Sequence, residues 1–241
     1  NRGQGLSPLP RGRVTGGSSA VNTCIALRGS PYDFDEWAEL GGAHWAWERC
    51  LPAFKRLEAF QDIDDPAIDG SIHGRDGPIP LRRHPPSELT TFQQAFLAGC
   101  DELGYPRCAD HNDATTTGHG AHTMNKIDGV RISTAMGYLD PNRGRENLHI
   151  QARSHVRRVL FENGRVVAVE INRDGMLKTH RCDQVVLCAG ATATPGILWR
   201  SGIGPRAELE RLRIDVVVDA PVGRRLLDHP AAGAVLVPRP G

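Results

Sequence analysis

Residues 11–22 of the chain read RGRVTGGSSAVN, in which two glycines, Gly16 and Gly17, directly precede the hydroxyl residues Ser18 and Ser19. Because glycine has no Cβ, such a pair allows positive φ and lets another group approach the backbone closely. The backbone N–H groups and serine hydroxyls can then face an anion or the polar edge of a ring. The pattern predicts a ligand-facing loop, and a plain glycine–serine surface turn is the alternative.

The bulk composition narrows the classes of protein to which the chain can belong. Its 241 residues suffice for one large domain or two small ones. The 29 basic residues nearly balance the 28 acidic ones, which gives no support to a nucleic-acid-binding face. No apolar run approaches the ~20 residues of a membrane span. The six cysteines form no CxxC pair and indicate the reduced thiols of a cytoplasmic protein.

Apolar residues recur at helical spacing in three segments, which predicts helices over residues 32–40, 48–60 and 88–103. Gly41-Gly42 and Gly104 should end the first and the third. The aromatic residues of the first two are expected in the core rather than against a cofactor. The third helix carries one apolar stripe, made of Leu89, Phe92, Phe96, Cys100 and Leu103.

The segments between these helices are less regular. Residues 21–27 are mostly apolar and fit either a buried helix or a strand. Residues 61–86 contain several aspartates, glycines and prolines and are expected to be a long surface connection. The aspartates lack the spacing of a calcium loop, so solvated loop charge is the expectation.

Potential metal ligands gather between residues 108 and 122, namely Cys108, Asp110, His111, His119 and His122. Their spacing matches no zinc pattern, and the segment is rich in threonine and glycine. We therefore expect no metal here, and interpret the histidines as turn residues or as the lining of a substrate cavity.

The second half of the chain has β character. Valine-rich runs separated by Asn163-Gly164 and Asp174-Gly175 predict a three-stranded antiparallel meander over residues 156–182. The apolar run at residues 184–189 suits a strand buried on both faces. Thr194-Pro195 should begin a helix that ends near residue 199, and residues 213–218 should form another short strand.

Two separated motifs resemble those of the glucose–methanol–choline (GMC) oxidoreductases, in particular the choline dehydrogenase-like members. GRVTGGSSAVN, with the following RGSPYDFDEWAELGG, is similar to the first family motif, and GATATPGILWRSGIG at residues 190–204 is similar to the second. Three shorter segments also resemble the family, namely WERCLPAFKRLE at residues 47–58, HGRDGPIPL at 73–81 and PVGRRLLDHP at 221–230.

The resemblance implies an α+β fold in which an incomplete FAD-binding domain is interleaved with part of a substrate domain. Residues 1–60 would belong to the FAD-binding domain, and residues 61–147 mainly to the substrate domain and its connections. Residues 148–230 would return to the FAD-binding domain, and residues 231–241 would begin a substrate-domain sheet.

The resemblance also implies the cofactor and its contacts. In some family members a histidine of the first motif attaches FAD covalently, but Val21 occupies that position here, so non-covalent FAD is expected. Val156 would contribute backbone contacts to the adenine end, and Gly190 would lie in the turn close to the nucleotide. The predicted cofactor-binding residues are Gly16, Gly17, Ser18, Asn22, Thr23, Val156 and Gly190.

The implied reaction is oxidation of the CH–OH group of a small-molecule alcohol. A base takes the hydroxyl proton, a hydride leaves to flavin N5, and the electrons pass to oxygen or another acceptor. The sequence contains no GxGxxG after a strand and no segment matching the family's catalytic histidine. We therefore expect a central fragment of a longer flavoprotein, inactive on its own, and assign no catalytic residue. The alternatives are a hydroxynitrile lyase on the same fold and a non-catalytic module or half of a split flavoprotein.

Overall fold

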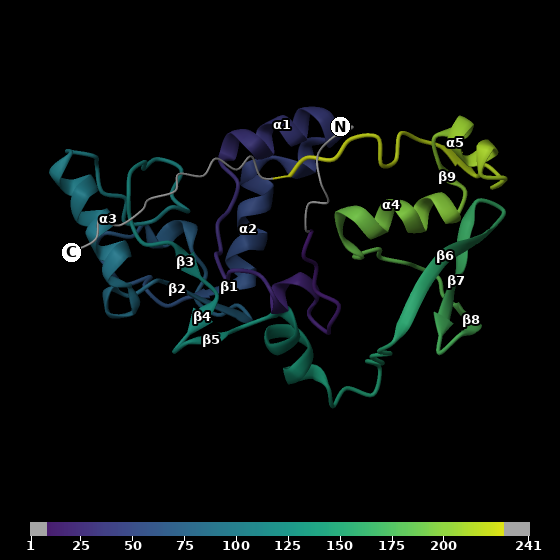
Figure 1. Cartoon of the computed structure of the whole chain (residues 1–241), viewed down its shortest axis with the longest axis horizontal. Helices are drawn as coiled ribbons and strands as arrows, with labels where there is room; N and C mark the ends of the chain where they lie inside the picture. The colour runs from purple at the N-terminus through teal and green to yellow at the C-terminus, as the bar shows by residue number, and fades with distance from the viewer. Residues whose placement is uncertain (1–8, 229–241) are drawn as a thin grey trace, which may run out of the picture. The chain divides into compact units, whose positions relative to one another are not determined.

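The computed structural model describes residues 9–228, so the expectation for residues 231–241 lies outside the described residues. The chain divides into two compact units, with the boundary between His149 and Ile150. Each unit is described by itself. Both contain helices and strands, which confirms the mixed α+β class (Figure 1).

The helix predicted over residues 32–40 is confirmed as α1 (Pro31–Gly41). It begins at a capping box in which the Asp33 carboxylate accepts a hydrogen bond from the backbone N–H of Ser30 at 2.7 Å. It ends at Gly42, whose φ of 107° few other residues adopt. Phe34 is buried as expected and its ring lies 5.6 Å from that of Phe54, whereas Trp37 is half exposed.

The second predicted helix is shorter than expected, because α2 (Trp47–Leu57) gives way to strand β1 (Glu58–Phe60). The HGRDGP segment lies directly against this junction. A Cβ on Gly74 would lie 1.8 Å from the Lys55 carbonyl oxygen, and one on Gly77 would lie 2.3 Å from the Glu58 nitrogen. Gly77 N–H donates to the Glu58 carbonyl at 2.9 Å, so backbone pairing with a distant segment ends the helix.

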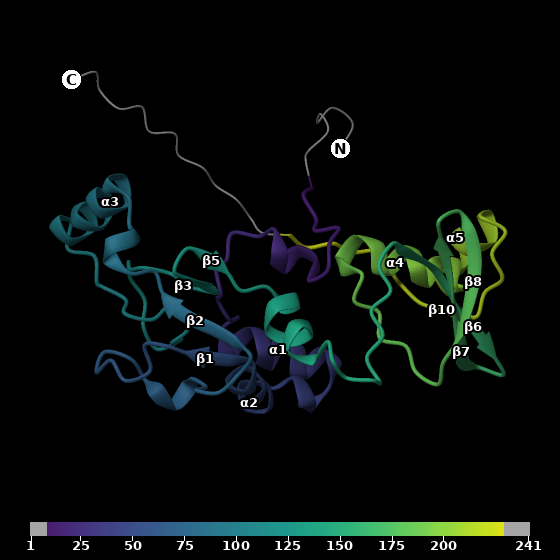
Figure 2. The same ribbon diagram turned by 90° about the horizontal axis from the view of Figure 1, so that it is seen from below.

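The segment expected to be a long surface connection, residues 61–86, is instead part of the core. It contains strand β2 (Ile79–Arg83), which pairs in parallel with β1 and antiparallel with β3 (Thr123–Met124) (Figure 2). Sheet register places Glu58 opposite Ile79 and Phe60 opposite Leu81. The buried cluster on this sheet comprises Phe60, Ile68, Ile79 and Leu81. Tertiary pairing thus overrides the polar composition of the segment.

The third predicted helix is confirmed as α3 (Thr91–Glu102), which begins after a Thr90–Gln93 capping box. Its apolar stripe is not buried within the described residues, since Phe92 is 64% and Phe96 59% exposed. Residues 21–27 form neither a helix nor a strand, and only an isolated bridge joins Ile25 to Met124. The remaining elements of this unit are η1 (Gly17–Ala20), η2 (Ala43–Trp45), η3 (Gly70–Ile72), η4 (Pro86–Glu88), β4 (Lys126–Ile127), β5 (Val130–Arg131), η5 (Ala135–Leu139) and η6 (Asp140–Asn142).

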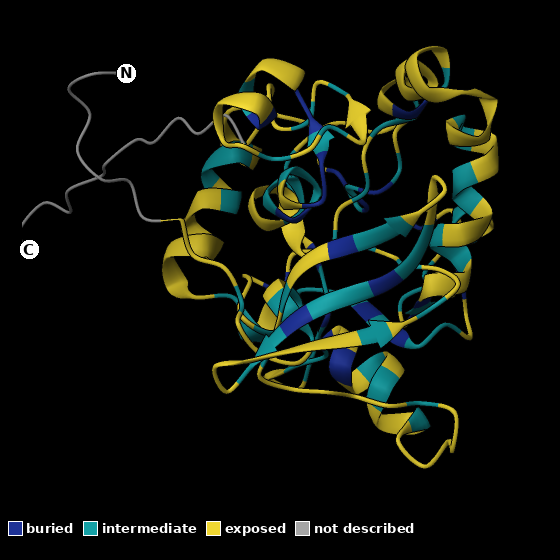
Figure 3. Cartoon of the chain, turned by 90° about the vertical axis from the view of Figure 1, so that its right-hand side faces the viewer, coloured by how far each residue is buried: buried dark blue, intermediate teal, exposed yellow. Residues whose placement is uncertain are grey.

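The second unit contains the predicted meander, confirmed as β6 (Ser154–Glu162), β7 (Arg165–Arg173) and β8 (Met176–Arg181). Both turns have the positive φ angles of a type I′ hairpin, 50° and 75° at Asn163-Gly164 and 52° and 82° at Asp174-Gly175. Figure 3 shows buried residues along two of the strands, whereas β8 is mostly exposed.

The strand predicted at residues 184–189 is wrong, because the structure has no strand there and Val186 is 84% exposed. A strand needs a hydrogen-bonded neighbour, and none of the described residues of this unit provides one. The following helix α4 (Gly190–Arg200) begins five residues earlier than the predicted N-cap Thr194 and first residue Pro195, so Pro195 lies inside it. Of the strand predicted at residues 213–218 only the last residue is in β10 (Val218–Asp219), which pairs in parallel with β9 (Ile203–Gly204). Helix α5 (Arg206–Arg211) lies between them in the sequence.

Candidate functional site

The first-motif loop, residues 12–23, folds back tightly on itself. The Ser18 hydroxyl accepts a hydrogen bond from the Gly12 N–H at 3.2 Å. A Cβ on Gly12 would lie 2.1 Å from the Gly17 carbonyl oxygen, a distance that no side chain tolerates. Gly16 has a φ of 92° and faces Ala135, whose Cβ would lie 3.2 Å from an added Cβ. Packing within the loop therefore requires Gly12, and the positive φ and the contact with Ala135 favour glycine at position 16.

Side chains fix this loop to the segment around residue 134. The Ser19 hydroxyl donates to the Gly16 carbonyl at 2.6 Å and accepts from the Thr134 N–H at 3.0 Å. The Asn22 side-chain oxygen accepts from the Cys24 N–H at 3.1 Å and from the Arg131 guanidinium at 2.5 Å. Asn22 thus has a structural role in holding the loop against Arg131.

The outward side of the loop is open. Gly17 has a φ of 56°, and no described residue lies within 4 Å of where its Cβ would be. Ser18, Asn22 and Thr23 are exposed. The structure therefore brings five of the predicted cofactor-binding residues into one accessible loop, and their contact with a cofactor stays a prediction.

Directly after this loop the chain enters a buried cluster of four charged side chains, Arg28, Glu58, His73 and Asp110, which we call the buried quartet. Arg28 donates to Glu58 at 2.6 Å. His73 bonds Glu58 through Nδ1 at 2.9 Å and Asp110 through Nε2 at 2.8 Å. All four side chains are at most 5% exposed. The net charge of the quartet is zero when both ring nitrogens of His73 are protonated.

The surroundings of His73 favour that proton. Burial by itself lowers the pKa of His73, but the hydrogen bonds and charges of Asp110 and Glu58 outweigh it and raise the pKa above 6.5. Burial by itself raises the pKa values of Glu58 and Asp110, but their hydrogen bonds to His73 outweigh it, so both pKa values are lowered. At Glu58 the charge of Arg28 lowers the pKa further. Phe60 stacks on the His73 ring with centroids 3.8 Å apart.

The quartet ties the segment after the first motif to the histidine-bearing segment at residues 108–122. Asn112 accepts from the Arg28 N–H at 2.8 Å and donates to the Ala26 carbonyl at 3.1 Å. Its own N–H donates to Asp110 at 2.9 Å. The relative position of these two segments is thereby fixed by charged and backbone hydrogen bonds.

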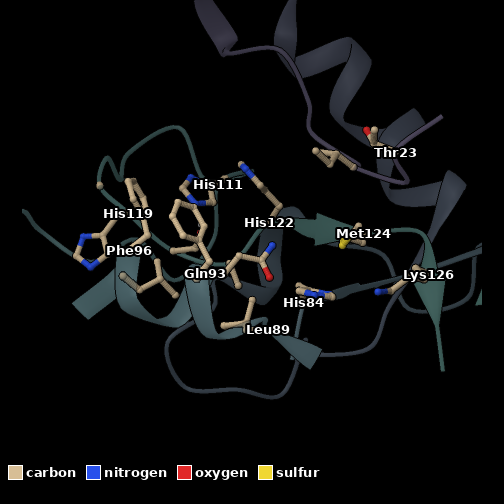
Figure 4. A pocket seen from close by; sticks show the side chains of 16 residues that line it. Thr23, His84, Leu89, Gln93, Phe96, His111, His119, His122, Met124 and Lys126 are labelled. Atoms are coloured by element: carbon tan, nitrogen blue, oxygen red, sulfur yellow. The ribbon is translucent and has the colours of Figure 1, made fainter. Parts of the chain in front are cut away.

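Both segments line a cavity of about 630 Å³ (Figure 4). Figure 4 shows Phe96 and Gln93 of α3 on one side with Leu89, which follows η4, and Thr23, Met124 and Lys126 on the other. His84, His111, His119 and His122 also line it. The expectation that the histidines line a cavity is therefore confirmed for three residues of the 108–122 segment. That the cavity takes a substrate is not tested by this geometry.

The cavity histidines differ in their partners. His119 bonds Asp101 through Nε2 at 3.1 Å, and His111 bonds the Gly120 carbonyl at 3.3 Å. The His122 ring lies 5.1 Å from that of His111, and neither of its nitrogens bonds another described residue. Partial desolvation, together with His111, lowers the pKa of His122 below 6.5. His122 is thus a neutral ring at neutral pH, and its nitrogens have no partner among the described residues.

The carboxylates near the cavity are already bound to cations. Glu88 accepts from Lys126 at 2.9 Å and from Arg82 at 2.5 Å. Asp101 is bound by Arg107 and His119. Among the described lining residues, none is an aspartate or glutamate. In the described ranges, no three His, Cys, Asp or Glu side chains are grouped so as to hold a metal ion.

The two predicted site residues of the second unit lie in different elements. Val156 lies half-buried in β6, and Gly190, with a φ of 83° and open space around it, begins α4. The contacts between these elements come from the other end of the helix, where Ser201 accepts from the Val159 N–H at 2.8 Å. Their relation to the first-motif loop is not defined, because each unit is described by itself.

Sequence reasoning missed Arg28, Glu58 and His73. His73 and Glu58 lie within HGRDGPIPL and WERCLPAFKRLE, so two of the shorter motifs did contain them. The bonds of the quartet join residues 15, 30 and 37 positions apart in the chain, which no local pattern reveals.

The comparisons with known proteins agree with the motifs. A family model described as GMC oxidoreductase matches residues 3–231. The oxygen-dependent choline dehydrogenase of Photobacterium profundum is 37% identical over 222 residues, covering 91% of this chain and 38% of that protein. The chain therefore spans about two fifths of the length of this relative.

Solved structures give the same result. The crystal structure of pyridoxine 4-oxidase from Mesorbium loti is 36% identical, with a TM-score of 0.79 and coverage of 88% of this chain and 41% of that one. An FAD-dependent oxidoreductase from Chaetomium thermophilum is 28% identical, with a TM-score of 0.78 and coverage of 88% and 38%. The match of the family model over nearly the whole chain shows that this chain belongs to the GMC oxidoreductase family.

Proposed function

We propose that the whole protein is an FAD-dependent oxidoreductase that acts on the CH–OH group of a small-molecule alcohol, with non-covalent FAD and oxygen or another acceptor as the final oxidant. A cytoplasmic location is part of the proposal. In the described part of the chain, no helix is both long enough and apolar enough to cross a bilayer. The observation that carries the proposal is the first-motif loop, which leaves the Gly17 backbone open to the described surroundings and whose last residue, Thr23, lines a cavity.

The loop fits a flat, hydrogen-bonding group such as a flavin. Gly12 and Gly16 face inward, where a side chain would collide, but Gly17 faces open space. A bare Cα at this position lets a planar ring approach the backbone, which a longer side chain would prevent. Gly16, Gly17, Ser18, Asn22 and Thr23 would hold the flavin part, and Val156 and Gly190 the nucleotide part.

When bound, FAD would supply the hydride acceptor for the alcohol carbon. The contribution of these residues is to position the cofactor and the substrate. The buried quartet holds the segment behind the loop in place, and the cavity supplies apolar walls beside it. The base that takes the hydroxyl proton is not assigned to any residue of this chain.

The test is the visible absorbance spectrum of the purified whole protein. We expect a flavin spectrum that disappears when an alcohol substrate is added without oxygen, because two electrons then remain on the cofactor. A flavin that no alcohol bleaches would contradict the oxidoreductase and favour the hydroxynitrile lyase.

A matched pair of variants tests the loop itself. Gly17→Leu should lower the FAD-to-protein ratio at least about fivefold, because the side chain fills the open face of the loop. Gly129→Leu is the control, since Gly129 has a φ of 77° and open space as well but lies in the β4–β5 turn. Equal flavin retention by both variants would contradict the proposed position of the cofactor.

A further inference from the structure

The cavity beside the first-motif loop has a chemical character that separates classes of alcohol. Its described lining combines apolar side chains, among them Phe92, Phe96 and Met124, with imidazole rings and one ammonium group. The described lining contains no acidic side chain. An alcohol with a positive charge would therefore meet no lining carboxylate among the described residues.

Nearby carboxylates cannot take that role either. Glu88 is shared between Lys126 at 2.9 Å and Arg82 at 2.5 Å, and Asp101 is shared between Arg107 and His119. A cation entering the cavity would lose water without gaining a free anionic partner, and this desolvation is unfavourable. The face of an aromatic ring attracts a cation by only about 0.5–2 kcal/mol, and Lys126 opposes it.

The same walls suit an uncharged ring. Phe92 and Phe96 project from α3 one helical turn apart and are more than half exposed, so their rings are available for apolar contact. Aromatic pairs gain about 0.5–1.5 kcal/mol beyond the burial of their area. His122 is neutral and has unbonded ring nitrogens, so it can exchange a hydrogen bond with a polar group on the substrate.

We propose that this cavity binds an uncharged aromatic alcohol and excludes quaternary ammonium alcohols such as choline. Phe92 and Phe96 contact the ring of the substrate, and His122 bonds a polar group. This inference rests on the proposed function, because it names the substrate class of the same site.

The test compares benzyl alcohol with choline as substrates of the whole FAD-loaded protein, with a dye as two-electron acceptor. Each alcohol loses two electrons and two protons to become the aldehyde, and the dye gains them. We expect kcat/KM to be at least about tenfold higher for benzyl alcohol, which corresponds to about 1.4 kcal/mol. A higher kcat/KM for choline overturns the inference.

Two aromatic truncations make the test specific to the cavity. Phe96→Ala should raise KM for benzyl alcohol about tenfold and leave the flavin spectrum unchanged. Tyr32→Ala is the control, because Tyr32 is an 84% exposed aromatic of α1 outside the cavity lining. Equal KM values for Phe96→Ala and the unaltered protein overturn the inference.

Failure of the proposed function would look different. A protein whose flavin is bleached by no alcohol contradicts both proposals. A flavin bleached by choline or an aliphatic alcohol in preference to benzyl alcohol leaves the oxidoreductase intact and overturns only the substrate class.

Discussion

His73 and His122 belong to the same unit of the protein, but their rings lie in opposite environments. The His73 ring is fully buried, and both of its nitrogens bond carboxylates. His122 faces a cavity and neither of its nitrogens bonds a described residue. The first environment raises the pKa of its histidine and the second lowers it. A histidine with every bond satisfied supports the structure, and one with free nitrogens is available to a ligand.

The largest effect is expected when the buried quartet loses its central carboxylate. Glu58→Ala leaves Arg28 and His73 without their shared partner, and breaking a buried ion pair from one side costs about 3–5 kcal/mol. The measurement is the free energy of unfolding by denaturant. The control is Glu48→Ala, since that side chain is 80% exposed and should change stability by less than about 0.5 kcal/mol. Similar losses for both variants would show that the quartet is unimportant for stability.

The next effect concerns the packing of the first-motif loop. Gly12→Ala would place a Cβ 2.1 Å from the Gly17 carbonyl oxygen, so the backbone must shift, at a cost of about 1–3 kcal/mol or more. Gly144→Ala is the matched control, because no atom lies within 4 Å of its Cβ position and its φ is not positive. The two melting temperatures provide the comparison, and an unchanged value for Gly12→Ala would contradict the close approach seen here.

A smaller effect should appear in the dependence of stability on pH. The pKa of His73 is raised above 6.5 in the folded state, so its contribution is complete below pH 6.5 and is lost as the pH rises through the folded value. The pKa values of Glu58 and Asp110 are lowered, so their contributions are complete above 4.5 and 3.8 and are lost as the pH falls. The quartet therefore favours folding most between about pH 4.5 and 6.5.

The pH prediction is checked by unfolding His73→Gln beside the unaltered protein from pH 5 to 9. The unaltered protein should lose stability on the alkaline side, and the difference between the two proteins should shrink there. A constant difference across this range would mean that His73 is not protonated in the folded protein.

The same contrast between local and distant contacts explains what the sequence could predict. The meander was predictable because the Asn163-Gly164 and Asp174-Gly175 pairs favour a type I′ turn by themselves, without a distant contact. Asp128-Gly129 closes the β4–β5 hairpin with the same signal, at φ angles of 48° and 77°. The first-motif loop was also found from its own residues. In contrast, the parallel pairing of Glu58 with Ile79 requires a distant partner, and a helix was predicted where β1 lies.

The candidate site divides in the same way. Its glycines and its cavity histidines are visible in the sequence, because unusual composition marks them. The quartet is not visible, since Arg28, Glu58, His73 and Asp110 come from four separate segments and are ordinary charged residues one by one. The strand predicted at residues 184–189 was wrong for another reason. Its composition is that of a buried strand, but no described residue pairs with it.

The smallest effect on stability, and the one that separates the two histidines most directly, is expected for His122→Gln. Its ring contributes no hydrogen bond to the described structure, so the free energy of unfolding should change by less than about 0.5 kcal/mol. If His122 bonds the substrate, KM for benzyl alcohol should rise about fivefold, corresponding to the ~1 kcal/mol of a neutral hydrogen bond. His149→Gln, an exposed histidine outside the cavity lining, should change neither quantity. A large loss of stability with an unchanged KM would contradict this prediction. His122 would then have a structural role like that of His73 and no role in binding the ligand.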